Sequence, residues 1–405
     1  MQKYPFFIIL IIINLSYQCY SQEIVKSSKT FKTISDPVTA VYYLPSDSDI
    51  VRLISIEKNI PDSSPYINNT YFSQYLIFSN GTKLTFQKDE VLIDFKNGFL
   101  ITRQKNTDNL LYIILRYYNL EKYKLIFKSQ ISIRVESQIF LFNNGNILIS
   151  DEYEFNGKTF KFYNTNLELI SQYDPLGENG FKSSVFYEYD NKLLAAIQSQ
   201  EPDSVTSNLI FEIFDLNSGN KIQEIKSSTR IEDLTSCIGN SNYVLVFADK
   251  KLIKINSSGQ EMWIRNIDWP SLEMAIVKQG QEVVVVVNDI IQSIALETGR
   301  IKWSKSFNDI NSIKNLSSTS RIGFGVLRLS TIFNDSSIGV LLAIYDKDKI
   351  NVSNKYSTSF LIYDLEGINK YVTNNAFNNN TSKMNVLESK ILIYNENNIN
   401  IYEKQ

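Results

Sequence analysis

Two pairs of carboxylates are the first candidates for chemistry in this sequence. Asp47 and Asp49 stand two residues apart in "PSDSDI", and Asp346 and Asp348 do so in "YDKDKI". In a strand this spacing directs both acids to one face, and in a loop it can begin a calcium site. Neither pair is followed by the further acids and the glycine of a calcium-binding loop. We expect exposed turn acids, with a weak cation site or catalysis as the alternatives, and we assign no catalytic, cofactor-binding or metal-binding residue.

The chain contains no histidine. This excludes Ser-His-Asp and Cys-His nucleophiles, the usual zinc sites and the commonest general base near neutral pH. Any catalysis would depend on carboxylates, lysine, tyrosine or a hard cation. A carboxylate pair of the glycosidase type would have to come from different repeats, so the sequence alone identifies none.

Glycine loops for phosphate are also missing, since neither G-x-G-x-x-G nor a Walker sequence occurs. The segment 323–326 ("GFGV") lacks the required lysine, and we predict that it is a strand. The formal net charge of −2 gives no basic field for nucleic acid. We therefore expect neither a nucleic-acid partner nor a bound cofactor.

The N-terminal segment 1–21 has the pattern of a secretory signal peptide. Lys3 precedes the apolar run "FFIILIIINL" (6–15) and the polar "SYQCYSQ" (16–22), and the run is short for a membrane span. We predict cleavage after Ser21 and a secreted or periplasmic protein, with an uncleaved anchor or a lipid on Cys19 as alternatives. Cys237 then remains without a cysteine partner, and its apolar surroundings predict a buried thiol, with a reactive thiol as the alternative.

Aromatic residues are abundant, with 24 Tyr, 24 Phe and 3 Trp. The clusters 41–43 ("VYY") and 115–119 ("LRYYN") are predicted to pack in a core, with a sugar or peptide groove as the alternative. Trp269 stands before Pro270 on an expected connection, where it is a candidate recognition residue. N-x-[ST] motifs, whose use depends on the host, occur at Asn68, Asn80, Asn256, Asn315, Asn334, Asn351, Asn379 and Asn380.

The elements that would hold these residues recur along the chain. Gly219, Gly259 and Gly299 are forty residues apart, and each stands in a polar turn between two apolar runs. Trp263 and Trp303 each follow their glycine by four residues. Gly81 and Gly367 extend the series outward. An interval of about forty residues is typical of β-propellers with four short strands in each blade.

A second series of turn residues lies between these hairpins, at Gly98, Gly145, Asn191, Gly239–Asn240 and Gly280. Glycine and asparagine tolerate the positive φ of tight hairpins. Each unit is therefore predicted to run strand, tight turn, strand, longer loop, strand, tight turn, strand.

These landmarks predict an all-β protein with a single propeller domain over 22–405. The units expected are 33–89, 90–130, 131–178, 179–228, 229–267, 268–307 and 308–374. The remaining C-terminal residues supply three strands, and the segment after residue 21 supplies a fourth that closes the ring. We expect eight blades, with seven as the alternative because unit 308–374 is long and its first strand ambiguous.

The segments "ALETGRIKW" (295–303) and "INSSGQEMW" (255–263) resemble the repeat of the pyrroloquinoline-quinone-like propellers. The resemblance implies that Trp263 and Trp303 pack between blades. Family members that use the quinone bring a calcium ion, a catalytic acid and often a vicinal disulfide, and this chain has no adjacent cysteines for that disulfide. Scaffold members of the family need none of these groups.

Two functions stay open on this basis. The first is an exported, monomeric binding or scaffold module for a protein or glycan, which does not insert into a membrane after signal cleavage. The second is an enzyme on the same ring, either a carboxylate-based hydrolase or lyase or a quinone-dependent dehydrogenase. Three or more acids from different blades converging on the axis would favour the enzyme.

Overall fold

The computed structural model describes residues 24–404 in part. Not described are 1–23, 31–37, 45–48, 60–69, 79–80, 88–89, 106–109, 120–123, 135–136, 154–156, 175–179, 201–206, 268–272, 278–280, 288, 311–321, 333–336, 347–356, 378–382, 387–389, 395–397 and 405. Within the described part no helix is long and apolar enough to span a membrane.

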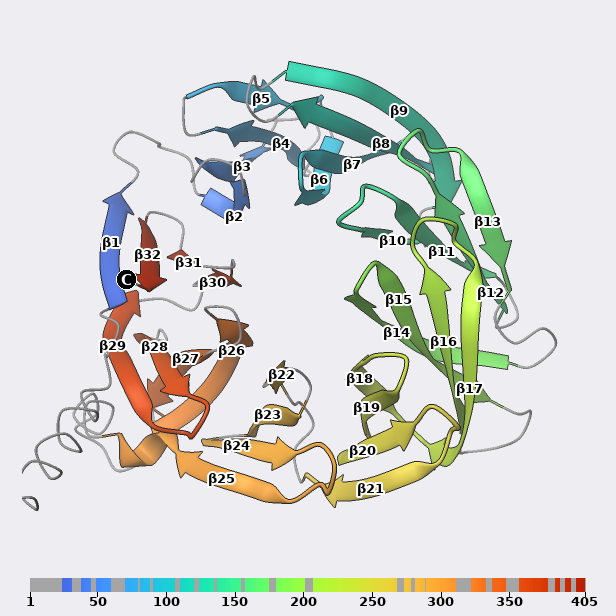
Figure 1. The fold of residues 1–405 in the computed structure, drawn as a ribbon. Coiled ribbons are helices and arrows are strands. Elements are labelled where there is room, and N and C mark those ends of the chain that lie inside the picture. The colour runs from blue at the N-terminus through green and yellow to red at the C-terminus, as the bar shows by residue number, and fades with distance from the viewer. Residues whose placement is uncertain are drawn as a thin grey trace, which may run out of the picture.

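The chain forms eight antiparallel sheets of four strands each, arranged as a ring (Figure 1). Blade 1 contains β2 (Val38–Leu44), β3 (Asp49–Asn59), β4 (Thr70–Ile77) and β5 (Lys83–Thr85). Blade 2 contains β6 (Glu90–Lys96), β7 (Phe99–Lys105), β8 (Leu110–Asn119) and β9 (Lys124–Arg134). Blade 3 contains β10 (Gln138–Leu141), β11 (Ile147–Tyr153), β12 (Gly157–Tyr163) and β13 (Leu169–Tyr173).

Blades 4 to 6 continue in the same strand order. Blade 4 contains β14 (Gly180–Tyr189), β15 (Lys192–Gln200), β16 (Ser207–Asp215) and β17 (Lys221–Ile231). Blade 5 contains β18 (Leu234–Gly239), β19 (Tyr243–Ala248), β20 (Lys251–Asn256) and β21 (Glu261–Asn266). Blade 6 contains β22 (Glu273–Val277), β23 (Glu282–Val287), β24 (Ile290–Ala295) and β25 (Ile301–Ser306). One turn of 3-10 helix, Phe307–Asp309, follows β25.

Blade 7 contains β26 (Ile322–Ile332), β27 (Ser337–Asp346), β28 (Ser357–Asp364) and β29 (Asn369–Phe377). Blade 8 combines the two ends of the chain, because β30 (Lys383–Val386), β31 (Lys390–Tyr394) and β32 (Asn398–Lys404) are joined by β1 (Ile24–Thr30) as the outer strand. β1 runs antiparallel to β32, with Val25 opposite Glu403. The prediction of eight blades closed by an N-terminal strand is thus confirmed.

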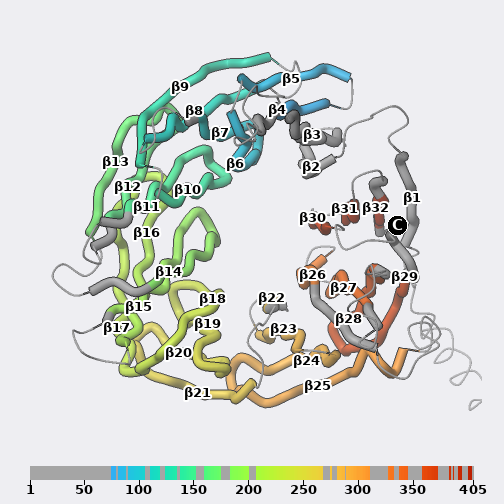
Figure 2. Tube along the Cα trace, turned by 180° about the vertical axis from the view of Figure 1, so that it is seen from behind, coloured from blue at the N-terminus to red at the C-terminus, as the bar shows by residue number. Residues whose placement is uncertain are grey.

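The first strand of each blade lies toward the centre of the ring and the fourth lies at the circumference. Both views show this order, with β6, β10 and β14 inside and β9, β13 and β17 outside (Figures 1 and 2). The predicted turns join strands 1 and 2 and strands 3 and 4 wherever they are described; Gly98 and Gly299, for example, have φ of +85° and +68°.

The predicted longer loop between strands 2 and 3 is wrong for two blades. In blade 5, β19 and β20 are joined by Asp249 and Lys250 alone, which have φ of 51° and 59°. Two positive φ values suit the twist of a two-residue hairpin, but the pair contains neither the glycine nor the asparagine on which the predicted turns were based. Blade 6 likewise has only residues 288–289 between β23 and β24. Three expected unit ends were also early, because β9 extends to Arg134, β17 to Ile231 and β29 to Phe377.

The hydrophobic core lies between the blades. Each buried apolar cluster takes side chains from two consecutive blades; one joins Val284 and Ile291 of blade 6 to Val340 and Leu361 of blade 7. Similar clusters join every consecutive pair from blades 1–2 to blades 7–8 within the described residues. Because one four-stranded sheet cannot cover its own apolar faces, each blade depends on its neighbours.

The tryptophans mark two of these contacts. The Trp263 ring of blade 5 lies against Gly299 of blade 6, and its Nε1 donates to the Leu296 carbonyl at 2.9 Å. Trp303 repeats the arrangement one blade later, against Gly367 and with its Nε1 donating to the Leu365 carbonyl at 2.9 Å. In blades 6 and 7, the turn glycine thus receives the indole of the blade before it.

Candidate binding pocket between blades 2, 3 and 4

A cavity of about 280 Å³ lies where the inner strands of blades 2, 3 and 4 meet. It is lined by Ile93, Asp94, Lys96, Ile139, Phe140, Leu141, Phe142, Phe186, Glu188 and Leu193. Nine of these residues belong to β6, β10 and β14 or directly follow β10, and Leu193 belongs to β15. The cavity therefore exists only because the ring brings three blades together. We call it the inner pocket.

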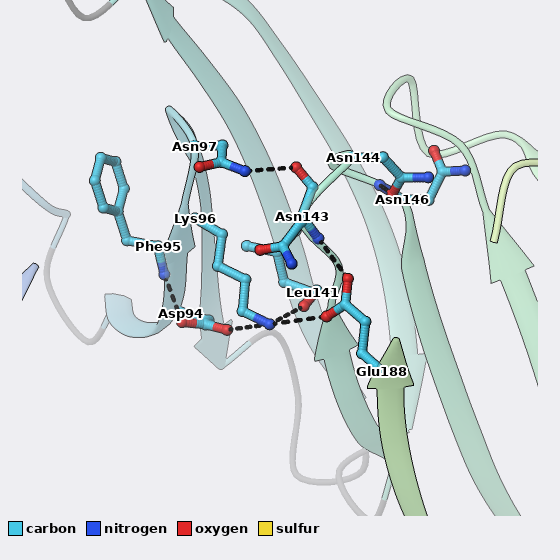
Figure 3. Close-up of polar contacts among 9 residues, drawn as sticks. All are labelled: Asp94, Phe95, Lys96, Asn97, Leu141, Asn143, Asn144, Asn146 and Glu188. Carbon is cyan, nitrogen blue, oxygen red and sulfur yellow. Dashed lines mark hydrogen bonds and ion pairs between the residues drawn. The ribbon is translucent and has the colours of Figure 1, made fainter. Parts of the chain in front are cut away.

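Lys96 stands at the centre of the polar end of the inner pocket (Figure 3). Its Nζ donates to the Leu141 carbonyl of blade 3 at 2.8 Å. The same Nζ lies 3.8 Å from Asp94 Oδ2 of its own strand and 3.5 Å from Glu188 Oε2 of blade 4. One ammonium group thus contacts all three blades.

Backbone N–H groups also hold the two carboxylates, each through the oxygen that does not face Lys96. The Phe95 N–H donates to Asp94 Oδ1 at 2.8 Å, and the Asn143 N–H donates to Glu188 Oε1 at 3.1 Å (Figure 3). Asn97 Nδ2 holds the Asn143 carbonyl at 3.1 Å. Asn97 and Asn143 belong to the tight turns that end β6 and β10, so the turns position the acids of the pocket.

The two acids and one lysine leave the pocket with a formal charge of −1. Burial raises the pKa of Asp94, and the negative charge of Glu188 raises it further, against the opposing effect of Lys96. The carboxylate of Asp94 is therefore less well stabilised than it would be in water. A hydrogen-bond donor that entered the pocket would find an acceptor there.

Of the other buried acids, Glu90 and Glu282 pair inside their own blades, whereas Glu212 of blade 4 also accepts from the Tyr173 hydroxyl of blade 3 at 2.5 Å. Glu90 and Arg116 pair at 2.5 Å in blade 2, and Glu282 and Lys302 pair at 2.6 Å in blade 6. Among the described residues there is no group of three or more cysteines and acids able to hold a metal ion. Within the described ranges, Asp94 and Glu188 are two acids from different blades that meet beside the axis, one fewer than the three that would favour an enzyme.

The residues singled out from sequence lie elsewhere. Asp47, Asp348 and Trp269 are outside the described residues; Asp49 begins β3 and Asp346 ends β27, with their side chains not described. Cys237 is buried between blades 4 and 5. Residues 323–326 lie in β26, as predicted, and 41–43 lie in β2.

Two further features of the sequence also have structural positions. In the cluster 115–119, Leu115 and Tyr118 are buried, and Tyr117 stacks on Phe99. Asn256 is the one N-x-[ST] asparagine that the structure describes, and its Oδ1 accepts from the backbone N–H groups of Ser258 and Gln260. The other seven motif asparagines are outside the described residues.

Sequence reasoning missed the inner pocket. The sequence did contain one signal for it. In two units, charged residues stand at the end of the first strand, just before the tight turn, in "IDFKNG" (93–98) and "YEYDN" (187–191). A charged residue that would face the axis of a ring is a candidate for a site. The pairing of Asp94 with Glu188 required the order of the blades in space.

Comparison with known proteins places the fold. No family model matches the chain. No curated protein matches it either. Among solved structures, BamB from Moraxella catarrhalis is 10% identical with a TM-score of 0.50, and the match covers 94% of this chain and 98% of that one.

Two other solved structures match with lower TM-scores. The Cps50 (Swd1) β-propeller domain of Myceliophteria thermophila has a TM-score of 0.45 at 10% identity, covering 94% of this chain and 100% of that one. Hsv2 of Kluyveromyces lactis has 0.44 at 13% identity, covering 84% and 98%. At 10% identity the likeness to BamB concerns the fold alone. The strand order defines that fold as a β-propeller of eight four-stranded blades.

Proposed function

We propose that this chain is an exported β-propeller that serves as a binding or scaffold module for a protein or glycan partner. One observation supports this proposal: the blades are regular, whereas the connections between their strands differ in length. The blades repeat one strand order, whereas the connections between strands 2 and 3 range from 249–250 and 288–289 to 60–69 and 347–356. Rigid scaffolds with variable connections are typical of recognition proteins.

The connections between strands 2 and 3 leave the blade at the edge opposite to the tight turns, because consecutive strands are antiparallel. The tight turns are fixed by their own side chains: Asp215 Oδ1 accepts from the backbone N–H groups of Asn217 and Ser218, and Asp364 Oδ1 accepts from Glu366 and Ile368. We infer that a large partner is recognised on the side of the long connections, by 60–69 and 201–206 in particular.

The test is capture from the native envelope or secretome with three proteins. These are the full chain, a variant with 60–69 and 201–206 each shortened to two residues, and a control with the exposed turn substitution Asn217→Ser. We expect the full chain and the control to retain the same partner and the shortened variant to lose it. Protease or glycosidase treatment of the extract then identifies the partner as protein or glycan. Equal capture by all three folded proteins would contradict the proposal.

Export is the second part of the proposal. The segment 1–21 supports it by its single charge and short apolar run. The N-terminal sequence of the protein recovered from its native compartment should begin at Gln22. A chain that keeps residues 1–21 would contradict the expected cleavage and would favour the anchor.

An enzyme is the alternative, and Asp94 with Glu188 is the observation that favours it. Two acids near one pocket, one with a raised pKa, are a pattern of carboxylate-based hydrolases and lyases. The position of Lys96 between the two acids favours a structural ion cluster instead. The quinone version follows from the repeat resemblance alone, and an absorbance spectrum with added quinone and Ca²⁺ tests it. An unchanged spectrum would reject it.

A further inference from the structure

We propose that the inner pocket holds the cationic head of a lysine or arginine side chain presented by a protein partner. This rests on the proposed binding function and adds a second contact, on the side of the ring opposite to the long connections. The carboxylates of Asp94 and Glu188, on either side of Lys96, form the polar end of the site. The apolar wall of the pocket receives the hydrocarbon stem.

Charge favours a cation over an anion. Lys96 is the one cation among the residues that line the inner pocket, and its Nζ already contacts the Leu141 carbonyl, Asp94 and Glu188. Two carboxylates face this single ammonium group, so an entering anion would meet a net negative charge. An entering cation would balance the second carboxylate.

Asp94 has an incompletely used oxygen. Its Oδ1 accepts from the Phe95 N–H at 2.8 Å, whereas its Oδ2 is 3.8 Å from Lys96 Nζ, which is beyond hydrogen-bond distance. Burial of this carboxylate also raises its pKa, because the charged form loses solvation there. A guanidinium or ammonium group supplies a donor for Oδ2 together with the missing charge.

The remaining wall fits an alkyl stem. Ile93, Ile139, Phe140, Phe186 and Leu193 line the cavity beside the charged group. Lysine and arginine bury their methylene stems along such surfaces while the charged end finds polar partners. A volume of about 280 Å³ lies just below the range of about 300–1,000 Å³ for small-molecule pockets. It therefore suits one side chain.

The site is open to a partner. The side chains of Lys96, Asp94 and Glu188 are 34%, 33% and 22% exposed. The pocket lies at the tight-turn end of β6 and β14. A basic side chain of a partner can therefore enter the ring from the side of the tight turns, which is opposite to the connections 60–69 and 201–206.

The experiment uses the full chain and three probes of matched backbone. These are Nα-acetyl-lysine methylamide, its arginine counterpart, and Nα-acetyl-norleucine methylamide as the uncharged form of the same stem. Binding is followed by NMR at the backbone amides of Phe95 and Asn143, which donate to the two carboxylates. Variants Asp94→Asn and Glu188→Gln remove one charge each, and Glu297→Gln, an exposed turn acid of blade 6, is the matched control.

We expect saturable shifts of both amides with the lysine or arginine probe, and at least tenfold weaker binding to Asp94→Asn and to Glu188→Gln. Glu297→Gln should bind like the original chain, and norleucine should give no saturable shift. If norleucine binds as well as lysine, or if both charge variants bind unchanged, the proposal is wrong. Either variant alone suffices for the comparison should the other not fold.

A second arm separates this proposal from the proposed function. Should the partner captured by the full chain be a protein, Asp94→Asn should reduce its affinity at least tenfold while the control leaves it unchanged. A protein partner that binds Asp94→Asn with full affinity would overturn the inner-pocket contact and leave the binding function standing. If the probes bind but no protein is captured, the claim that a protein partner presents the basic side chain is wrong. The ligand would then be a free amine.

Discussion

At the scale of single residues, buried charge in this protein is paired. Glu90 is fully buried and pairs with Arg116 at 2.5 Å, and the Thr102 hydroxyl donates to the same carboxylate oxygen at 2.5 Å. Burial alone would raise the pKa of Glu90, but the hydrogen bonds from Arg116 and Thr102 hold it below its usual range. The pair joins strands 1 and 3 of blade 2.

Glu90→Gln should lower the free energy of unfolding by about 3–5 kcal/mol at pH 7, because Arg116 would be left buried without a counter-ion. The measurement is urea denaturation, with the exposed Glu297→Gln as the matched control expected to change little. The difference should shrink as pH falls below about 4.3, the ordinary pKa of glutamate, because protonation removes the same stabilisation from the original chain. A loss at pH 7 no larger than that of the control would contradict this account.

Cys237 shows the opposite condition, a buried group without charge. Burial raises the pKa of its thiol to about 12, and the sulfur lies 3.7 Å from the Val185 carbonyl of blade 4. Because the thiolate is the reactive form, Cys237 should not react with a thiol reagent at pH 8 while the protein is folded. Labelling followed by mass spectrometry tests this, and reaction should appear only across the urea transition. Rapid labelling in the folded state would mean that blades 4 and 5 separate.

At the scale of elements, the hairpin between strands 3 and 4 does two tasks. In blades 6 and 7 its glycine allows the positive φ of the turn and also leaves room for the aromatic ring of the preceding blade. A Cβ at Gly367 would lie 2.5 Å from Trp303 Cδ2, whereas a Cβ at Gly81 would meet nothing within 4 Å. Both glycines have similar φ, +79° and +85°.

This contrast gives a matched pair of substitutions. Gly81→Ala should cost only the backbone strain, about 1–2 kcal/mol. Gly367→Ala should cost that strain plus overpacking of about 1–3 kcal/mol, because Trp303 must move. Thermal and urea unfolding measure the two values. Equal losses would mean that the indole does not lie against the turn in solution.

The hairpins were predictable and the inner pocket was not, for a physical reason. Gly299 and Trp303 lie within one hairpin, so their spacing in the sequence is their spacing in the fold. Asp94 and Glu188 meet only because blades 2 and 4 both adjoin blade 3. The two-residue turn at Asp249–Lys250 was also missed, since its positive φ values carry no glycine or asparagine signal.

At the scale of the whole molecule, the ring depends on the two ends of the chain. Each blade covers the apolar face of the next, and blade 8 is completed by β1 from the opposite end. This closure removes an open sheet edge and holds each blade against its neighbours, which the three-blade inner pocket requires. The repeat interval predicted the ring, and the incomplete C-terminal unit predicted how it closes.

The most direct test is a cross-link between β1 and β32. Val25 and Glu403 are directly opposite in the register, where Cα atoms are about 4.5–5.5 Å apart, within the range for a disulfide. In a chain with Cys19→Ser, the pair Val25→Cys and Glu403→Cys should form an intramolecular disulfide under mild oxidation. The pair Lys26→Cys and Glu403→Cys, one residue out of register, should not. A folded protein in which the first pair stays reduced, or links only between molecules, would show that the ring is not closed by its N-terminal strand.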